Sequence, residues 1–320
     1  MQKTNINWCT HTWNPIVGCS PCSPGCENCY AKALHDKRHA ASYTALLPVQ
    51  YDKPFSQIQF FPDRLRDPLK LKKLATIFVC SMGDIFHPEV MWEWQHEVFT
   101  AMYSADWHRY MVLTKRPKEM LRFFRTIEDW ETRDWRHLWI GVTVCNQQEA
   151  DEKIPILLQT PAAHRFVSIE PMLGPIDLTC LQHNLEYELN ALNGDHGVIR
   201  PLQGRSDARL DLVIVGGETG PNARPMHPDW VRLIRDQCQG AGVPFHFKGW
   251  GKWSQTLRGT YERPDRVWAM KPDGTVEPRP SRCTEDEEIL IVPIRARTVN
   301  RLLDGREHNG ATEIQERIEQ

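Results

Sequence analysis

The chain has 320 residues, 41% of them hydrophobic, a length that suits one barrel-sized domain or two ordinary domains. Its 39 Lys and Arg nearly balance its 41 Asp and Glu, so the overall charge indicates no nucleic-acid partner, although a local basic groove would not show in that sum. No apolar run resembles a signal peptide or approaches the roughly 18 residues of a membrane span. We therefore expect a cytoplasmic protein without membrane contact, whose ten cysteines form no disulfide framework.

Short apolar runs that end in polar residues or glycine alternate with helix-like segments along most of the chain. The expected strands cover residues 10–17, 76–84, 110–117, 138–146, 164–171, 210–218 and 244–251. The expected helices cover residues 88–105, 117–127, 147–159 and 228–242. Buried strands that alternate with helices indicate a parallel sheet. The predicted fold class is therefore α/β, a partial (β/α) TIM-type barrel of six or seven parallel strands, with an open doubly wound sheet as the alternative.

The rhythm of strands and helices defines the expected domains. Residues 1–251 are assigned to the barrel, and within them 179–209 form a long insertion loop without clear periodicity, typical of a lid, a binding loop or a disordered segment. After residue 251 the alternation stops, and residues 265–278 are expected to form a hairpin that turns at Asp273 and Gly274. Residues 252–320 are therefore predicted to be a small C-terminal appendage.

Polar side chains gather where the expected strands end. The candidates for ligand contact are Asp84, Lys115, Arg116, Ser168, Glu170 and Glu218. Because the strands of a barrel direct their carboxyl ends toward one mouth, we expect these groups to lie near each other. Taken singly, each has a structural alternative, since polar residues also finish strands and cap the following helix. Asp84, for example, could cap the helix expected to begin near Pro88.

Four cysteines, Cys19, Cys22, Cys26 and Cys29, lie within eleven positions. Structural zinc sites usually combine two CxxC pairs separated by a dozen or more residues, whereas only three residues separate the pairs here. Thiolates so closely spaced on one loop are typical of iron–sulfur ligation. The pattern favours an iron–sulfur cluster and leaves zinc open. Three ligands would leave one iron free for a small molecule, and four would make a closed electron-transfer centre.

Two motifs resemble radical S-adenosylmethionine (SAM) enzymes, particularly the spore photoproduct lyase-like branch. "GCENCYA" at 25–31, with "GC" at 18–19, resembles the cysteine loop of that branch, and "CSMGDIFHPEV" at 80–90 looks like its segment near the SAM amino group. Phrases such as "RFVSIEPMLGPIDL" and "GVPFHFKGWG" are similar to a phage and bacterial family of unknown function, a radical SAM-like family named after two numbered phage gene products. On these motifs the chain is identified as a member of that phage protein family.

The resemblance implies a metal site and a cofactor. It implies a [4Fe–4S] cluster held by Cys19, Cys26 and Cys29, with Cys22 as the alternative to Cys19. Met82, Gly83 and Asp84 would contact the SAM amino group, and Lys115 and Arg116 would bind the SAM carboxylate or a substrate phosphate. Ser168, Glu170 and Glu218 would contact SAM or substrate at the same mouth. Their role as ligand contacts stays a prediction.

The expected function is reductive cleavage of SAM to a 5′-deoxyadenosyl radical that modifies a substrate. An external one-electron reductant would be required, and the resemblance favours a nucleic acid or nucleotide as substrate. Two other classes stay open: a zinc-stabilised nucleic-acid-binding phage protein, and a ferredoxin-like electron carrier that uses all four thiols.

Overall fold

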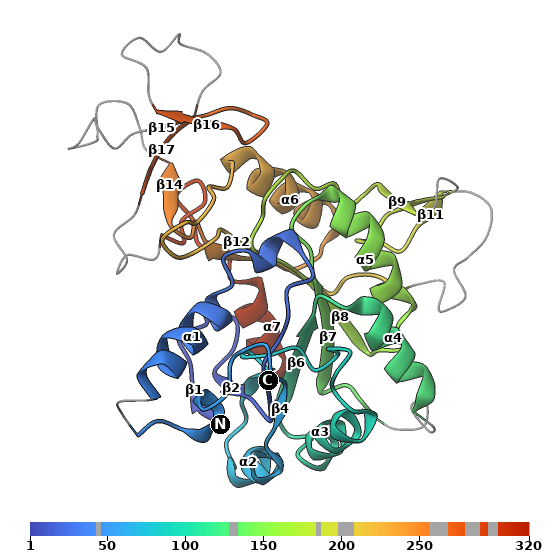
Figure 1. The fold of residues 1–320 in the computed structure, drawn as a ribbon. Helices are drawn as coiled ribbons and strands as arrows, with labels where there is room; N and C mark the ends of the chain where they lie inside the picture. The colour runs from blue at the N-terminus through green and yellow to red at the C-terminus, as the bar shows by residue number, and fades with distance from the viewer. Residues whose placement is uncertain are drawn as a thin grey trace.

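The computed structural model describes residues 1–42, 46–127, 134–183, 187–197, 208–255, 268–278, 289–293 and 300–319. Its centre is a curled eight-stranded sheet in the order β1-β2-β5-β6-β7-β8-β12-β13 (Figure 1). The bounds are β1 Gln2–Lys3, β2 His11–Trp13, β5 Thr76–Val79, β6 Arg109–Thr114, β7 Leu138–Thr143, β8 His164–Ile169, β12 Leu212–Gly216 and β13 Phe245–Gly249. Only β1 is antiparallel to its neighbour, and the other strands follow chain order in parallel. The expected α/β class with a mostly parallel sheet is confirmed, and the sheet has the shape of an open half-barrel.

Four helices that follow these strands cover the outer face of the sheet. They are α3 (Trp92–Ser104), α4 (Pro117–Thr126), α5 (Gln147–Gln159) and α6 (Pro228–Ala241), close to the ranges expected from the sequence. Each buries an apolar stripe, and these stripes join strand residues such as Ile77, Val112 and Val213 in the main core. Helix α6 ends as expected at a glycine, Gly242, whose φ of 68° suits the left-handed C-cap.

Two boundaries differ from the sequence prediction. Helix α3 begins at Trp92 and not near Pro88, because residues 84–90 form successive turns closed by His87 N to Asp84 O and Val90 N to His87 O. Helix α1 (Tyr30–Ser42), directly after the cysteine loop, was not predicted. Only Ala31 and His35 of α1 are buried, so its sequence carries no apolar stripe that would signal a helix.

The opposite face of the sheet is filled by a second apolar cluster. Its strand residues, Phe78, Met111, Trp139, Phe166 and Ile214, alternate along the chain with those of the main core, as period-two side chains must. The last helix, α7 (Gly310–Glu319), supplies Ala311 to this cluster, and Ile314 packs against it. Helix α7, within the segment 252–320 that was predicted to be a small appendage to the barrel, thus packs against the half-barrel.

Smaller sheets surround the half-barrel (Figure 1). Within the segment expected as a long loop, β9 (Leu181–His183), β10 (Tyr187–Leu189) and β11 (His196–Gly197) form an antiparallel sheet. Beyond residue 251, β14 (Trp253–Gln255), β15 (Trp268–Met270), β16 (Val276–Pro278) and β17 (Ile289–Pro293) form another. The hairpin of β15 and β16 is the one expected, with Gly274 at φ 87° in its turn, while its residues 265–267 lie outside the described residues.

Near the N-terminus β3 (Ile16–Val17) pairs with β4 (Gln59–Phe60), and a short helix α2 spans Asp67–Lys70. Three 3₁₀ turns cover Pro24–Cys26, Val49–Tyr51 and Pro62–Arg66. In the part of the chain that the structure describes, no helix has both the length and the apolar character needed to span a membrane.

Candidate functional site

The cysteine loop lies at the carboxyl edge of the parallel sheet, after β2 and β3. Two backbone hydrogen bonds fix its entry, from Gly18 N to Met82 O at 3.0 Å and from Cys19 N to Phe55 O at 2.9 Å. Gly18 has φ 105°, and a Cβ there would stand 2.6 Å from Gln57 O, so only glycine suits this position. The "GC" that opens the loop is therefore explained first by backbone geometry.

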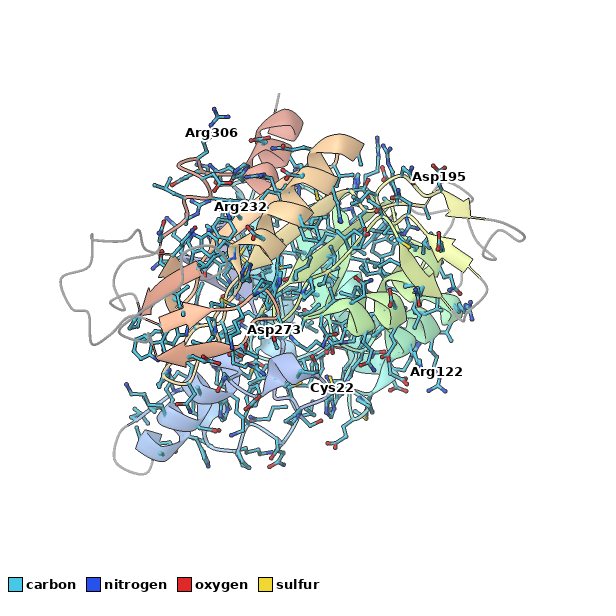
Figure 2. The ribbon with its side chains drawn as sticks, turned by 90° about the horizontal axis from the view of Figure 1, so that it is seen from above. Cys22, Arg122, Asp195, Arg232, Asp273 and Arg306 are labelled. Atoms are coloured by element: carbon cyan, nitrogen blue, oxygen red, sulfur yellow. The ribbon has the colours of Figure 1, made fainter. Side chains whose placement is uncertain are left out.

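The four thiols differ in exposure. Cys19, Cys26 and Cys29 are half-buried, whereas Cys22 is exposed, and none of the four forms a disulfide. Cys19 and Cys29 pack against a small apolar cluster that includes Val17, Ala31, Phe55 and Met82. Cys22 lies beside the short helical turn of the loop in the view of Figure 2. Three thiols are thus built into the protein, and the fourth faces solvent.

Hydrogen bonding sets the charge state within the loop. A hydrogen bond from the Cys22 thiol, followed by smaller contributions that include nearby Lys115, lowers the pKa of Cys26 to about 5 against the opposing effect of burial. The same contact, together with burial, raises the pKa of Cys22. The two thiols titrate as a coupled pair, and their contact favours the charged form of Cys26. A thiolate is the form of cysteine that binds metals.

Arg116 ties the loop to Asp84. Its guanidinium pairs with Asp84 Oδ2 at 3.0 Å and donates from Nη1 to Cys19 Sγ at 3.4 Å and from Nη2 to Ser20 O at 2.7 Å. Asp84 is 5% exposed, and both of its carboxylate oxygens also accept hydrogen bonds from Thr114 Oγ1 at 2.8 and 2.9 Å. The carboxylate of Asp84 is therefore fully used inside the protein, and it supports Arg116.

Asp84 does not cap helix α3, because Met91 occupies the N-cap and makes no side-chain hydrogen bond there. Oδ1 of Asp84 instead accepts a hydrogen bond from Phe86 N at 3.0 Å, and this bond stabilises the turn after β5. Next to it, Met82 N donates to Asn14 Oδ1 at 2.8 Å. Gly83 forms a parallel bridge with Gly18. The Met82–Asp84 segment thus lies beside the cysteine loop, as the sequence suggested, and holds it by its backbone.

Sequence reasoning did not find the contribution of His87. Its Nδ1 accepts a hydrogen bond from Glu89 N at 3.2 Å, so the proton lies on Nε2, which donates to Ser20 Oγ at 2.7 Å. The same hydroxyl accepts from Arg116 Nη2 at 3.3 Å. His87 and Arg116 therefore position Ser20, the residue after Cys19, from two sides. The buried, polar "DIFHP" turn was the only signal in the sequence.

Lys115, the residue directly after β6, lies near the thiols of the cysteine loop. Burial by itself would lower the pKa of Lys115, but its electrostatic interaction with the surrounding groups, Cys26 first among them, raises the pKa overall. Among the described residues no carboxylate forms an ion pair with its ammonium group. Lys115 and Arg116 therefore supply the positive charge that thiolates in the loop require.

Glu218 lies across the mouth from Arg116 and binds the other side of the loop. Its Oε2 accepts from Asn28 Nδ2 at 3.0 Å and from Arg224 Nε at 2.9 Å, and its Oε1 pairs with Arg224 Nη2 at 2.6 Å. Arg224 also donates hydrogen bonds from Nη1 to Glu27 Oε2 at 2.8 Å and from Nη2 to Pro24 O at 3.0 Å. The carboxylate of Glu218 is 5% exposed and is saturated by these donors. Sequence reasoning missed Asn28, which lies 190 positions from Glu218, and Arg224, which lies only six positions from it.

Ser168 and Glu170 form a separate group on β8 and just after it. Ser168 Oγ donates to Glu170 Oε2 at 3.1 Å, and Lys248 Nζ pairs with Glu170 Oε1 at 2.7 Å. The structure thus brings Met82, Gly83, Asp84, Lys115, Arg116 and Glu218 to the cysteine loop by direct contact or charge. Between the described residues no hydrogen bond or ion pair joins Ser168 or Glu170 to it.

In the described part of the chain, which includes all four loop cysteines, no three His, Cys, Asp or Glu side chains group around one metal-ion position. The loop still offers the thiol donors that an iron–sulfur cluster requires, with the cations of Lys115 and Arg116 beside them. Whether the loop binds a cluster or zinc stays a prediction from the sequence.

Comparison with known proteins corrects the family expected from the sequence. The family described as "Protein of unknown function (DUF5131)" matches residues 3–312. No curated protein and no solved structure matches the chain. The assignment to the phage gene-product family, with its radical SAM-like and spore photoproduct lyase-like resemblance, is wrong, because a distinct family accounts for nearly the whole chain. The protein belongs to the DUF5131 family.

Proposed function

We propose that the cysteine loop binds a [4Fe–4S] cluster through Cys19, Cys26 and Cys29 and that the protein is a radical SAM enzyme. The observation that carries the proposal is the arrangement of three half-buried thiols beside two cations at the carboxyl edge of a half-barrel. Such an edge is where barrel enzymes place their active sites. In this proposal the half-barrel is a partial TIM-type, radical SAM-like barrel, and the protein is located in a reducing cytoplasm.

Cys19 is preferred over Cys22 as the first ligand on two structural grounds. Cys19 packs against the apolar cluster and receives the hydrogen bond from Arg116, so its thiol has a fixed position. Cys22 is exposed, and its contact is the thiol of Cys26. An exposed side chain loses more conformational entropy when it is fixed as a ligand.

When bound through Cys19, Cys26 and Cys29, the cluster together with SAM would supply reductive SAM cleavage, with one electron from an external reductant, and abstraction of hydrogen from substrate. The protein residues position this chemistry. Asp84 holds Arg116, Arg116 holds Cys19 and Ser20, and Glu218 holds Asn28 and Arg224 on the far side of the loop. Lys115 remains as the cation available to one anionic group, either the SAM carboxylate or a substrate phosphate.

Anaerobic purification and reconstitution test the proposal directly. We expect about four irons per chain, a brown chromophore, and 5′-deoxyadenosine after reduction in the presence of SAM. Cys26→Ser and Cys29→Ser should lose iron, and Cys22→Ser should retain it. Zinc at about one per chain, or about four irons per chain without any SAM cleavage, would contradict the proposed radical SAM activity. Loss of iron in all four single variants would point to a closed electron-transfer centre.

A further inference from the structure

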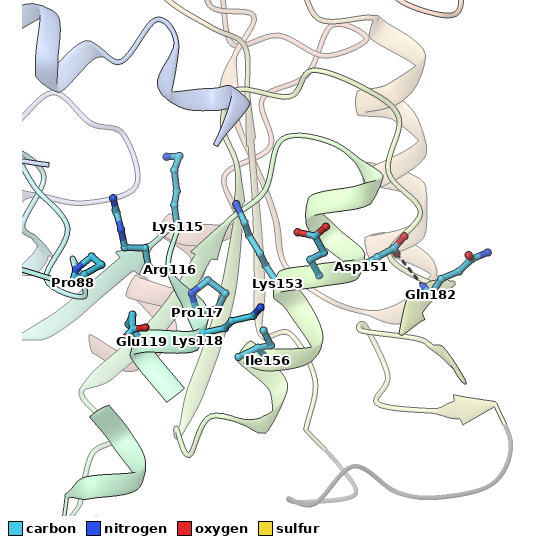
Figure 3. Close-up of a pocket in the computed structure, with 11 residues that line it drawn as sticks. Pro88, Lys115, Arg116, Pro117, Lys118, Glu119, Asp151, Lys153, Ile156 and Gln182 are labelled. Atoms are coloured by element: carbon cyan, nitrogen blue, oxygen red, sulfur yellow. Dashed lines mark hydrogen bonds between the residues drawn. The ribbon is translucent and has the colours of Figure 1, made fainter. Parts of the chain in front are cut away.

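A cavity of about 600 Å³ lies between helices α4 and α5, next to the cysteine loop (Figure 3). Its volume lies within the range of small-molecule sites, about 300–1,000 Å³. Lys115 and Arg116 form part of both the cavity wall and the surroundings of the thiols, and in Figure 3 their side chains point toward the N-terminal segment that carries the cysteines. A ligand in this cavity would therefore lie beside the proposed cluster.

Three cationic side chains, those of Lys115, Arg116 and Lys118, line the cavity. In Figure 3 Lys115 and Arg116 lie at the end nearest the N-terminal segment, and Lys118 extends toward Ile156. Arg116 is committed to Asp84, but in the described part of the chain neither Lys115 nor Lys118 forms an ion pair. Glu119 also lines the cavity and is paired with Arg122 at 3.2 Å. Two ammonium groups without a carboxylate partner at the wall of one cavity favour an anionic ligand group.

The opposite end carries acceptors. Asp151, Glu152 and Gln182 line it, on α5 and β9. Asp151 Oδ1 accepts from Gln182 N at 3.0 Å, which fixes the carboxylate at the rim, and Figure 3 shows this pair on the side away from Lys115. Lys153, between the two ends, is neutralised by Glu149 Oε1 at 2.6 Å. Carboxylate acceptors favour hydroxyl or amino donors on that part of the ligand.

The middle of the cavity is apolar, with Pro117 and Ile156 among its lining residues. Such a surface suits a ring that packs between the polar ends. The first turn of α4 adds to the cationic end, since its N-cap residue, Arg116, makes no side-chain hydrogen bond to it. The cavity and its two unpaired lysines, and not this helix end, carry the inference.

We propose that this cavity binds a phosphorylated molecule of mononucleotide size, with its phosphate at Lys115 and Lys118 and its hydroxyl or amino donors at Asp151 and Glu152. A phosphate carries up to two charges and three acceptor oxygens, which match two ammonium groups better than a single carboxylate does. That the ligand is the substrate rests on the function proposed above. Its binding does not depend on the cluster.

The test is calorimetric titration of the anaerobically purified full-length protein with the four common nucleoside 5′-monophosphates, the corresponding nucleosides and inorganic phosphate. We expect at least one monophosphate to bind, its nucleoside to bind at least about tenfold more weakly, and inorganic phosphate also to bind more weakly. Lys118→Ala should weaken monophosphate binding about tenfold. Lys118 is exposed, so this substitution leaves folding intact.

Lys37→Ala is the matched control, because Lys37 is also an exposed lysine in a helix but lies on α1, away from α4 in Figure 1. It should leave affinity unchanged. Absence of monophosphate binding, equal affinity for the nucleoside or for inorganic phosphate, or equal behaviour of the Lys118 and Lys37 variants would overturn the proposal. Iron content is measured on the same samples. If a monophosphate binds to protein that incorporates no iron, the proposed radical SAM activity is contradicted and the cavity site is not. If the protein incorporates iron but binds no monophosphate, the cavity site is contradicted and the proposed activity is not.

Discussion

Replacement of Arg224 by alanine should show how strongly the cysteine loop depends on the far side of the mouth. The side chain of Arg224 makes two hydrogen bonds to the carboxylate of Glu218, at 2.9 and 2.6 Å, and one each to Glu27 and to Pro24 O. In the Arg224→Ala variant Glu218 would retain Asn28 Nδ2 and the backbone N–H of residue 224 as donors. A buried carboxylate would thus lose its only ion-pair partner in the described structure.

The magnitude follows from exposure. Glu218 has a side chain that is 4% exposed, and removing the partner of a buried ion pair costs about 3–5 kcal/mol. Arg224 itself is 31% exposed, so water replaces part of the interaction, and the two remaining donors satisfy part of the charge. The pair with Glu27, whose side chain is 70% exposed, adds little. We therefore expect the free energy of unfolding to fall by about 2–3 kcal/mol.

Urea unfolding at pH 7 measures this loss, with Arg136→Ala as the control. Arg136 also makes a bidentate contact with a carboxylate, that of Asp134, but both side chains are exposed. The free energy of unfolding should therefore not change in this control. Faster alkylation of the loop thiols in Arg224→Ala would show that the loop itself has loosened. If both variants lose the same small amount of stability, Glu218 does not depend on Arg224 and the reasoning fails.

Three further predictions concern other parts of the fold. Asp84→Asn should lower the free energy of unfolding by about 1.5–3 kcal/mol while the affinity for SAM stays unchanged, because the carboxylate serves Arg116; weaker SAM binding at unchanged stability, by calorimetry and urea unfolding, would contradict this. Burial lowers the pKa of His246 to about 3, so the unfolded state binds the proton first, and stability should fall by up to about 1.4 kcal/mol per pH unit as pH drops from about 6.5 toward 3. In the His246→Asn variant the free energy of unfolding, measured with urea, should depend less steeply on pH in this range. An unchanged slope would exclude His246 as the cause of the acid destabilisation. Gly310→Val should displace α7 and increase binding of an apolar dye, since a Cβ there would stand 2.7 Å from the backbone of Phe245; native dye binding with native stability would show that α7 adapts.

The sequence by itself determined the α/β class with a mostly parallel sheet. Runs such as residues 76–79 and 138–143 are mainly apolar and buried throughout, as a strand buried on both faces requires. The outer helices follow from their periodic apolar residues. The cysteine spacing likewise drew attention to the loop, because cysteines on one short segment are local information. The family was misread, since the phrases that suggested it occur in a distinct family that matches residues 3–312.

Only the tertiary structure decided what the polar residues do. Asp84 and Glu218 were predicted to contact a ligand, a role that stays a prediction, and the structure shows that their carboxylates pair with Arg116 and Arg224. Helix α7 has only Ala311 and Ile314 in the inner core among its described side chains, so its sequence gave no sign that it packs on the half-barrel. Burial and ion pairing depend on contacts between distant segments, whereas strand and helix patterns depend on neighbours, and only the second kind can be read along the chain.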